Sequence, residues 1–220
     1  MSVLQPGRLL AVFDLDGTIS RHDTMMPFVF GWWWRHPWRW WRLPGVLPTL
    51  VAFATGRADR GALKGALLRF TLGGLPRPAV ELWARHYVDA LIRGGLFADA
   101  VARVRAHRDA GDYLVLMSAS IDCYVPLIAE ALGFDECVCS QVRWHADGRL
   151  DGRLAGANCR GAEKSRQLLA MRERLRPGSV IAYGNSSADL PHLRLADRAV
   201  YVNAGAVEVP VPHVDKVQWR

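Results

Sequence analysis

Two carboxylates stand one residue apart at the end of an apolar run, in the stretch AVFDLDGTIS, where Asp14 and Asp16 precede Gly17. In an extended chain, residues two apart point to the same side, so both carboxylates can face one point. Their mutual repulsion brings no structural gain unless a cation lies between them, or a reaction needs one group ionised and the other protonated. The pair therefore indicates a metal site, acid–base chemistry or nucleophilic chemistry.

Three further segments supply polar side chains that suit the same chemistry. Ser118 follows the apolar run 113–117, Lys164 lies near the start of a helical segment, and GNSSAD supplies Asn185 and Asp189. Ligands of open parallel sheets bind beyond the carboxyl ends of the strands, so we expect these groups to meet at one edge. Hard oxygen ligands beside a lysine and a serine predict a site for Mg²⁺ and a phosphate group.

Apolar runs that alternate with helical segments must position these residues. This alternation predicts an α/β fold, a parallel sheet flanked by helices on both faces. We expect strands at residues 9–13, 113–117, 180–183 and 199–202, and a hairpin of 138–144 with 149–154 around Asp-Gly turns. We expect helices at residues 98–110, 122–132, 162–175 and 190–195.

Residues 19–97 interrupt the alternation. They lack strand-like patterning, and 60–72 and 79–95 have helical composition. We therefore expect a core domain of residues 1–18 and 98–220, with residues 19–97 inserted after the first strand as a helical cap. The insertion carries eleven basic and four acidic residues, an excess that equals the net charge of +7 of the whole chain.

The order of these motifs resembles the haloacid dehalogenase (HAD) superfamily. DLDGT, a helical insertion, MSAS, Lys164 and GNSSAD follow one another from residue 11 to about residue 192. The position of the insertion is similar to that in the phosphoserine-phosphatase-like branch. The resemblance implies a Rossmann-like HAD core with a helical cap, and a phosphatase that forms an aspartyl-phosphate.

The resemblance also implies roles for individual residues. Asp14 would be the nucleophile, and Asp16 would protonate the leaving oxygen and then activate water. The residues that would brace the loop or hold the phosphoryl oxygens are Thr18, Ser118, Ala119 and Lys164.

Mg²⁺ is the cofactor that the resemblance implies. Asp14, the backbone carbonyl of Asp16 and Asn185 would bind it, with Asp189 in support. The family usually has Asp where this chain has Asn185, so we expect weaker metal binding, because an amide oxygen carries no negative charge. A catalytically weak HAD binding module is an alternative interpretation.

Six of the nine tryptophans lie between Trp32 and Trp41, interleaved with Arg35 and Arg39. The apolar stretch that follows is too short to span a bilayer, which needs roughly 20 residues. Ten residues cannot bury six indoles in one thin helical layer, so we expect several to be exposed. Trp and Arg together suit the headgroup layer of a membrane, which predicts a peripheral membrane contact. A homodimer or other protein interface and a cap core are alternatives, and nucleic acid is not an expected partner.

The same segment bears on the substrate. Its layout is similar to that of HAD-type phosphatidylglycerophosphate phosphatases, which implies a lipid or amphiphilic phosphate as substrate. Asp23 stands near the position at which phosphoserine phosphatases carry the acidic residue that reads the substrate's amino group. A soluble phosphatase for a small metabolite such as phosphoserine is therefore the alternative.

The cysteines and the N-terminal sequence bear on localisation. MSVLQPGRLL lacks the pattern of a secretory signal peptide, and the four cysteines have no paired metal-binding spacing. We expect reduced, structural thiols in a cytoplasmic protein that can lie on the inner face of the membrane.

Overall fold

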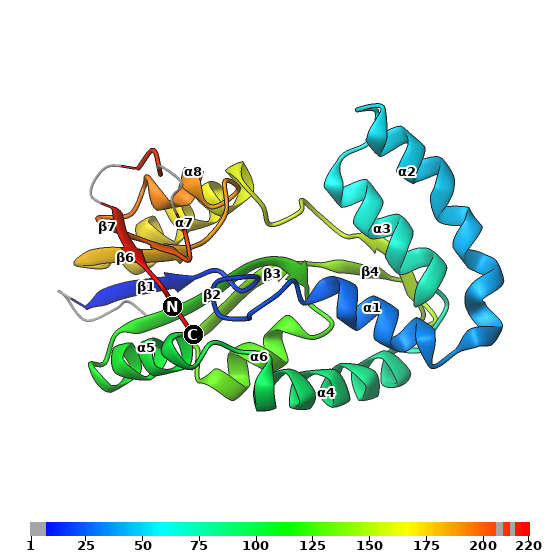
Figure 1. The fold of residues 1–220 in the computed structure, drawn as a ribbon, viewed down its shortest axis with the longest axis horizontal. Helices are drawn as coiled ribbons and strands as arrows, with labels where there is room; N and C mark the ends of the chain where they lie inside the picture. Colours follow the sequence, from blue (N-terminus) through cyan, green and yellow to red (C-terminus); the bar gives the residue numbers. More distant parts are fainter. Residues whose placement is uncertain (1–7, 206–208, 212–213) are drawn as a thin grey trace.

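The computed structural model describes residues 8–205, 209–211 and 214–220, and its centre is a parallel sheet with six described strands (Figure 1). The strand order is β3-β2-β1-β6-β7-β8. The strands are β1 (Leu9–Phe13), β2 (Tyr113–Ile121), β3 (Glu136–Ser140), β6 (Ser179–Gly184), β7 (Arg198–Val202) and β8 (Val214–Val217). The first seven residues of the expected core lie outside the described residues.

Strand β1 lies inside the sheet, between β2 and β6. All five of its residues are apolar, as expected of a parallel strand that is covered on both faces. Ala11 and Phe13 pack into one hydrophobic cluster, and Leu10 and Val12 pack into another. Helices α5 (Ala98–Asp109) and α6 (Val125–Leu132) cover the first face, and α7 (Ala162–Leu175) and α8 (Leu190–Leu193) cover the second (Figure 1). The expected α/β fold is confirmed.

The chain between β1 and α5 is helical, as predicted. It forms α1 (Met25–Trp34), the 3₁₀ helix η1 (Pro37–Val46), α2 (Leu47–Ala54), α3 (Arg60–Thr71) and α4 (Arg77–Gly94). Helix α3 begins after Asp59, whose side chain accepts a hydrogen bond of 2.7 Å from the backbone N–H of Ala62. Helices α1, α2 and α3 lie together at one side of the sheet, whereas α4 runs along α6 (Figure 1).

The hairpin is shorter than predicted. Residues 138–140 belong to β3 and pair in parallel with β2, and the hairpin consists only of β4 (Val142–Trp144) and β5 (Leu150–Leu154). A single residue separates β3 from β4, so the apolar pattern gives no sign that the chain changes sheets there. The hairpin packs on α3, and the Gly74 N–H donates to the Leu150 carbonyl at 2.8 Å. Strand β8 also extends the sheet beyond the four predicted strands.

The tryptophan-rich segment is partly exposed, as expected. The side chains of Trp34, Trp38 and Trp41 are 70%, 67% and 78% exposed. Trp32 instead packs against Trp83 of α4. In the described part of the chain, no helix is long and apolar enough to cross a bilayer. All four cysteines are free thiols.

Candidate active site

Asp14 and Asp16 lie on the turn that follows β1. The Asp14 N–H still donates to the Tyr183 carbonyl of β6 at 3.0 Å, and the N–H groups of Thr18 and Ser20 then bond back to the Leu15 carbonyl. Gly17 adopts a φ of 78°, and a Cβ there would collide with the Asn185 side-chain amide. Glycine thus lets the Asp-Gly-Thr turn approach the loop after β6 closely.

Lys164, on the first turn of α7, joins two of the predicted carboxylates. Its Nζ donates to Asp14 Oδ1 at 2.5 Å and to Asp189 Oδ1 at 2.7 Å. All three side chains are buried. A buried cation between two buried carboxylates leaves one net negative charge, and neither carboxylate is left without a partner.

Burial and charge set the protonation states of this triad. Burial, followed by the negative charge of Asp189, raises the pKa of Asp14 to about 7. Burial also acts to raise the pKa of Asp189, but the charge and hydrogen bond of Lys164, together with His192 and the Ser186 hydroxyl, outweigh it and lower that pKa to about 2. Burial acts to lower the pKa of Lys164, and the two carboxylates outweigh it, so this pKa is raised. Asp14 is therefore the member of the triad that exchanges a proton near neutral pH.

Asp16 is held in place by two side chains from different elements. Its Oδ1 accepts from the Thr24 N–H at 2.7 Å and from Thr24 Oγ1 at 2.6 Å, and its Oδ2 accepts from Ser120 Oγ at 2.8 Å. Because the Thr24 hydroxyl donates to Asp16, the Tyr124 hydroxyl 2.9 Å away must donate to Thr24. Burial raises the pKa of Asp16 despite these donors. Thr24 and Tyr124 are not among the predicted site residues, because a threonine before a helix and a tyrosine in an apolar segment carry no local signal.

A cavity of about 360 Å³ brings most of the predicted site residues together. The predicted residues that line it are Asp14, Asp16, Asp23, Ala119, Lys164, Asn185 and Asp189. Two arginines and an imidazole that are not among the predicted site residues also line the cavity: Arg21, Arg160 and His22.

Two of the residues predicted to brace the loop or hold the phosphoryl oxygens, Thr18 and Ser118, do not line this cavity. Thr18 and Ser118 are fully buried. Thr18 Oγ1 donates to Asp14 Oδ2 at 3.2 Å, and Ser118 Oγ accepts from the Ser120 N–H at 3.0 Å. In this arrangement Thr18 supports the turn that carries Asp14, and Ser118 supports the end of β2 that carries Ser120.

Asp23 and Ala119 line the cavity, and each also accepts a hydrogen bond from a residue outside it. Asp23 Oδ1 accepts from the Met26 N–H at 2.8 Å, at the start of α1. The Ala119 carbonyl accepts from Lys64 of α3, so the C-terminal part of β2 is tied directly to the inserted helices.

The donor set of the cavity fits a magnesium ion. Asn185 Oδ1 is buried and has no hydrogen-bond partner, as expected of an oxygen that serves as a metal ligand. Among residues 8–205, 209–211 and 214–220, no three His, Cys, Asp or Glu side chains form a metal-holding group. The carboxylate oxygens that line the cavity and Asn185 Oδ1 are hard donors, which Mg²⁺ prefers together with water and a substrate phosphate.

Comparison with known proteins places this geometry in a family. The chain is 37% identical over 198 residues to protein CicA of Caulobacter vibrioides, covering 88% of this chain and 85% of that protein. It is 28% identical over 202 residues to the phosphoserine phosphatase SerB1 of Mycobacterium tuberculosis, covering 89% of this chain and 65% of that protein.

A solved structure shares the fold. The crystal structure of a protein of unknown function from Bordetella pertussis superimposes with a TM-score of 0.75 at 22% identity, covering 91% of this chain and 92% of that one. The family model of haloacid dehalogenase-like hydrolases matches residues 11–194, which include every predicted catalytic and metal-binding residue. The chain therefore belongs to the haloacid dehalogenase-like hydrolase family.

Proposed function

We propose that this protein is a Mg²⁺-dependent phosphomonoester hydrolase that forms an aspartyl-phosphate on Asp14. One observation carries the proposal: Lys164 holds Asp14 and Asp189 in a buried triad, while Asp16 faces the same cavity. A nucleophile, a proton carrier and a cation thus surround a space large enough for a phosphate group. Phosphoryl transfer depends mainly on positioning and charge neutralisation, and these residues supply both.

The reaction has two steps: Asp14 is the nucleophile of the first and the leaving group of the second, and Asp16 acts first as an acid and then as a base. An Asp14 carboxylate oxygen attacks phosphorus, the bond to the leaving oxygen breaks, and Asp16 gives that oxygen its proton. Asp16 then takes a proton from water, whose oxygen attacks the phosphorus of the acyl-phosphate. Inorganic phosphate leaves and the Asp14 carboxylate is restored. The raised pKa of buried Asp16 favours the protonated form with which this cycle begins.

Phosphatases of this family generally use Mg²⁺. Asp14, Asn185 and the backbone carbonyl of Asp16 would hold it, with Asp189 in support. When bound, the ion neutralises charge on the phosphoryl oxygens and favours ionised Asp14. Asn185 contributes an oxygen without charge, so we expect the chain to need more Mg²⁺ than a variant with Asp at this position.

We assign a lipid or amphiphilic phosphate as the substrate, met at a membrane surface. Between Asp23 and Asp59 the sequence has no acidic residue, yet it contains Arg35, Arg39, Arg42 and Arg57. Basic residues near an anionic membrane contribute about 1 kcal/mol each to binding. The exposed indoles of the same segment suit the headgroup layer, so charge and apolar surface support the same partner.

A soluble phosphoserine-like phosphatase is the second candidate. Asp23 favours it, because its carboxylate lines the same cavity as Asp14, where it could receive a substrate ammonium group. The similarity to SerB1 agrees with this possibility. Asp23 also accepts the Met26 N–H, so its position at the cavity has a structural explanation as well.

Phosphate release in the presence of Mg²⁺ separates the candidates. The substrates are phosphatidylglycerophosphate in mixed micelles, phosphoserine and a panel of soluble phosphomonoesters, with Asp14→Asn as the blank. Faster turnover of the lipid, lost in the blank, supports the proposal, whereas preference for phosphoserine supports the second candidate. Absence of a trapped aspartyl-phosphate with every substrate would instead support a binding module without catalysis.

A further inference from the structure

Two neighbouring cavities between the inserted helices share one wall residue. The first, of about 310 Å³, lies beside Asp16 and Ser120 and reaches Leu67 of α3. The second is a groove of about 490 Å³ whose nine lining residues are all apolar, among them Leu67, Trp33 and Trp40. Leu67 therefore separates the catalytic side from an apolar groove that the proposed reaction does not use.

The lining residues form stripes that run from one cavity to the other. On α1, Met26 lines the catalytic-side cavity, and Phe30 and Trp33 line the groove. On α2, Phe53 lines the first cavity, and Leu50 lines the groove.

Helix α3 repeats the arrangement, with Leu63 in the first cavity and Leu67 in both. A spacing of three or four residues places each stripe on one face of its helix. These side chains define an apolar path, called the passage below, that runs along the three helices from the cavity beside Asp16 past Leu67 to the groove.

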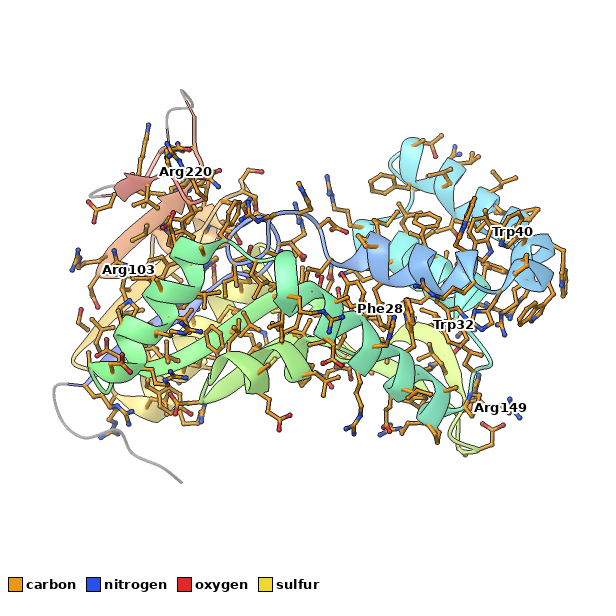
Figure 2. All side chains as sticks on the ribbon, turned by 60° about the horizontal axis from the view of Figure 1, so that its bottom comes forward. Phe28, Trp32, Trp40, Arg103, Arg149 and Arg220 are labelled. Carbon is orange, nitrogen blue, oxygen red and sulfur yellow. The ribbon has the colours of Figure 1, made fainter. Side chains whose placement is uncertain are left out.

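The passage leads away from the sheet. From Met26 to Trp33, α1 rises about 10 Å at 1.5 Å per residue. Trp40, which lines the outer part of the groove, lies at the end of the molecule opposite the main sheet (Figure 2). A linear chain that enters beside Asp16 can therefore extend toward the tryptophan-rich segment.

The surfaces along the passage are suited to one kind of occupant. Leu47 and Leu50 are 56% and 45% exposed, although both line the groove, so the protein itself leaves apolar surface uncovered there. The Trp40 indole N–H is already bonded to the Trp33 carbonyl at 3.1 Å. At the catalytic end, Arg60, Lys64 and Arg160 supply positive charge beside the carboxylates of Asp16 and Asp23. An occupant with an anionic end, which these cations attract, and an apolar tail fits the two cavities.

We propose that this passage binds the alkyl chain of the phosphorylated substrate while its phosphate group lies at Asp14. The inference rests on the proposed phosphatase function and narrows its substrate class to phosphomonoesters with a linear alkyl chain. Leu67, at the boundary of the two cavities, then helps to determine specificity, because every chain that reaches the groove must pass it.

Binding of alkylphosphonates tests the passage without turnover, because their carbon–phosphorus bond is not hydrolysed. Dissociation constants are measured by calorimetry with the Mg²⁺-loaded protein, for chains from butyl to dodecyl, each below its critical micelle concentration. Burial of a methylene is worth about 0.8 kcal/mol, so each one should tighten binding up to about fourfold. The gain should stop once the chain fills the passage. Affinity that does not depend on chain length overturns the proposal.

Hydrolysis of the matching alkyl phosphates tests the proposed function separately. In one outcome, the phosphonates bind with the expected chain-length dependence while the wild type hydrolyses no alkyl phosphate faster than Asp14→Asn does. That result would support the passage and refute the phosphatase function. If all chain lengths are hydrolysed alike and the phosphonates also bind alike, the function stands and the passage is refuted.

A charge placed in the groove provides the structural test. Leu50→Glu should weaken dodecylphosphonate binding at least tenfold and leave butylphosphonate unchanged. Leu82→Glu is the matched control, because Leu82 is 71% exposed on α4 and lines neither cavity. Equal weakening of both ligands by Leu50→Glu, or the same selective loss in Leu82→Glu, contradicts the proposal.

Two other occupants would be recognised in the same experiment. If Leu50→Glu separates a dimer in light scattering but leaves dodecylphosphonate affinity unchanged, the groove is an interface between two copies. If it abolishes sedimentation with anionic vesicles and again leaves that affinity unchanged, the groove contacts the bilayer. Either result overturns the assignment to the substrate's chain.

Discussion

Replacing Lys164 with Met removes the cation from the buried triad and keeps a side chain of similar length. In the native protein Lys164 Nζ lies 2.5 Å from Asp14 Oδ1 and 2.7 Å from Asp189 Oδ1. The variant leaves two buried carboxylates that face each other without a cation. Removal of one partner from a buried ion pair costs about 3–5 kcal/mol, so we expect a loss of at least about 3 kcal/mol in the free energy of unfolding at pH of about 8.

The loss should shrink in acid. Removing Lys164 raises the pKa of both carboxylates, so at each pH these two groups bind at least as many protons in the folded variant as in the folded wild type; the proton of Lys164 itself is bound in both the folded and the unfolded wild type and cancels. Its deficit in stability therefore decreases as the pH falls, by about 1.4 kcal/mol per pH unit for each additional proton bound. In the wild type the pKa of Asp14 is about 7 and that of Asp189 is about 2, so each carboxylate of the variant binds its additional proton at pH values above these.

Urea denaturation with EDTA, at pH of about 8 and about 5, measures both effects. A deficit of about 3 kcal/mol corresponds to a fall in Tm of roughly 6–12 °C for a chain of this size. Lys64→Met is a useful control, because Lys64 is also partly buried but lies outside the triad. An equal deficit at both pH values would show that the lost stability comes from packing, and would refute the charge argument.

Three further predictions concern the same site. Gly17→Ala should reduce the free energy of unfolding by about 1–3 kcal/mol in urea denaturation, because alanine is strained at this positive φ and would displace Asn185; unchanged stability would contradict this. Apparent Mg²⁺ affinity, measured by calorimetry, should rise about tenfold from pH of about 6 to about 8, because Asp14 must lose its proton to bind the ion; a flat profile would show that no ligand of the ion titrates in this range, and would contradict a pKa of about 7 for Asp14. Thr24→Val should lower kcat roughly tenfold, since Asp16 loses a hydroxyl donor at 2.6 Å; an unchanged kcat would show that this bond does not position Asp16.

Much of the fold could be predicted because its signals are local. The five apolar residues of β1 and the carboxylates that follow them lie in one continuous stretch, and α7 begins and ends at the predicted residues. Carboxyl ends of parallel strands share an edge, so the order of motifs was enough to bring Asp14, Lys164 and Asp189 together. The exposed indoles were also predictable, because ten residues provide too little interior for six of them.

The supporting contacts could not be predicted, because they join residues far apart in the chain. The Ser120–Asp16 hydrogen bond spans 104 residues, and the Thr24–Tyr124 contact spans 100. Neither follows from periodicity, since each depends on how two elements are placed in three dimensions. The switch from β3 to β4 is of the same kind, because strand pairing rather than local pattern decides to which sheet a residue belongs.

The sequence by itself thus determined the α/β core, the helical insertion and the meeting of Asp14, Lys164 and Asp189, because apolar periodicity and strand direction specify all three. Only the tertiary structure decided that Asn185 lies against Gly17 and that Leu67 stands between a catalytic cavity and an apolar groove. The physical reason is that cavities form where the faces of several helices meet. The relative positions of α1, α2 and α3 are set by packing across the whole insertion, and no single segment encodes them.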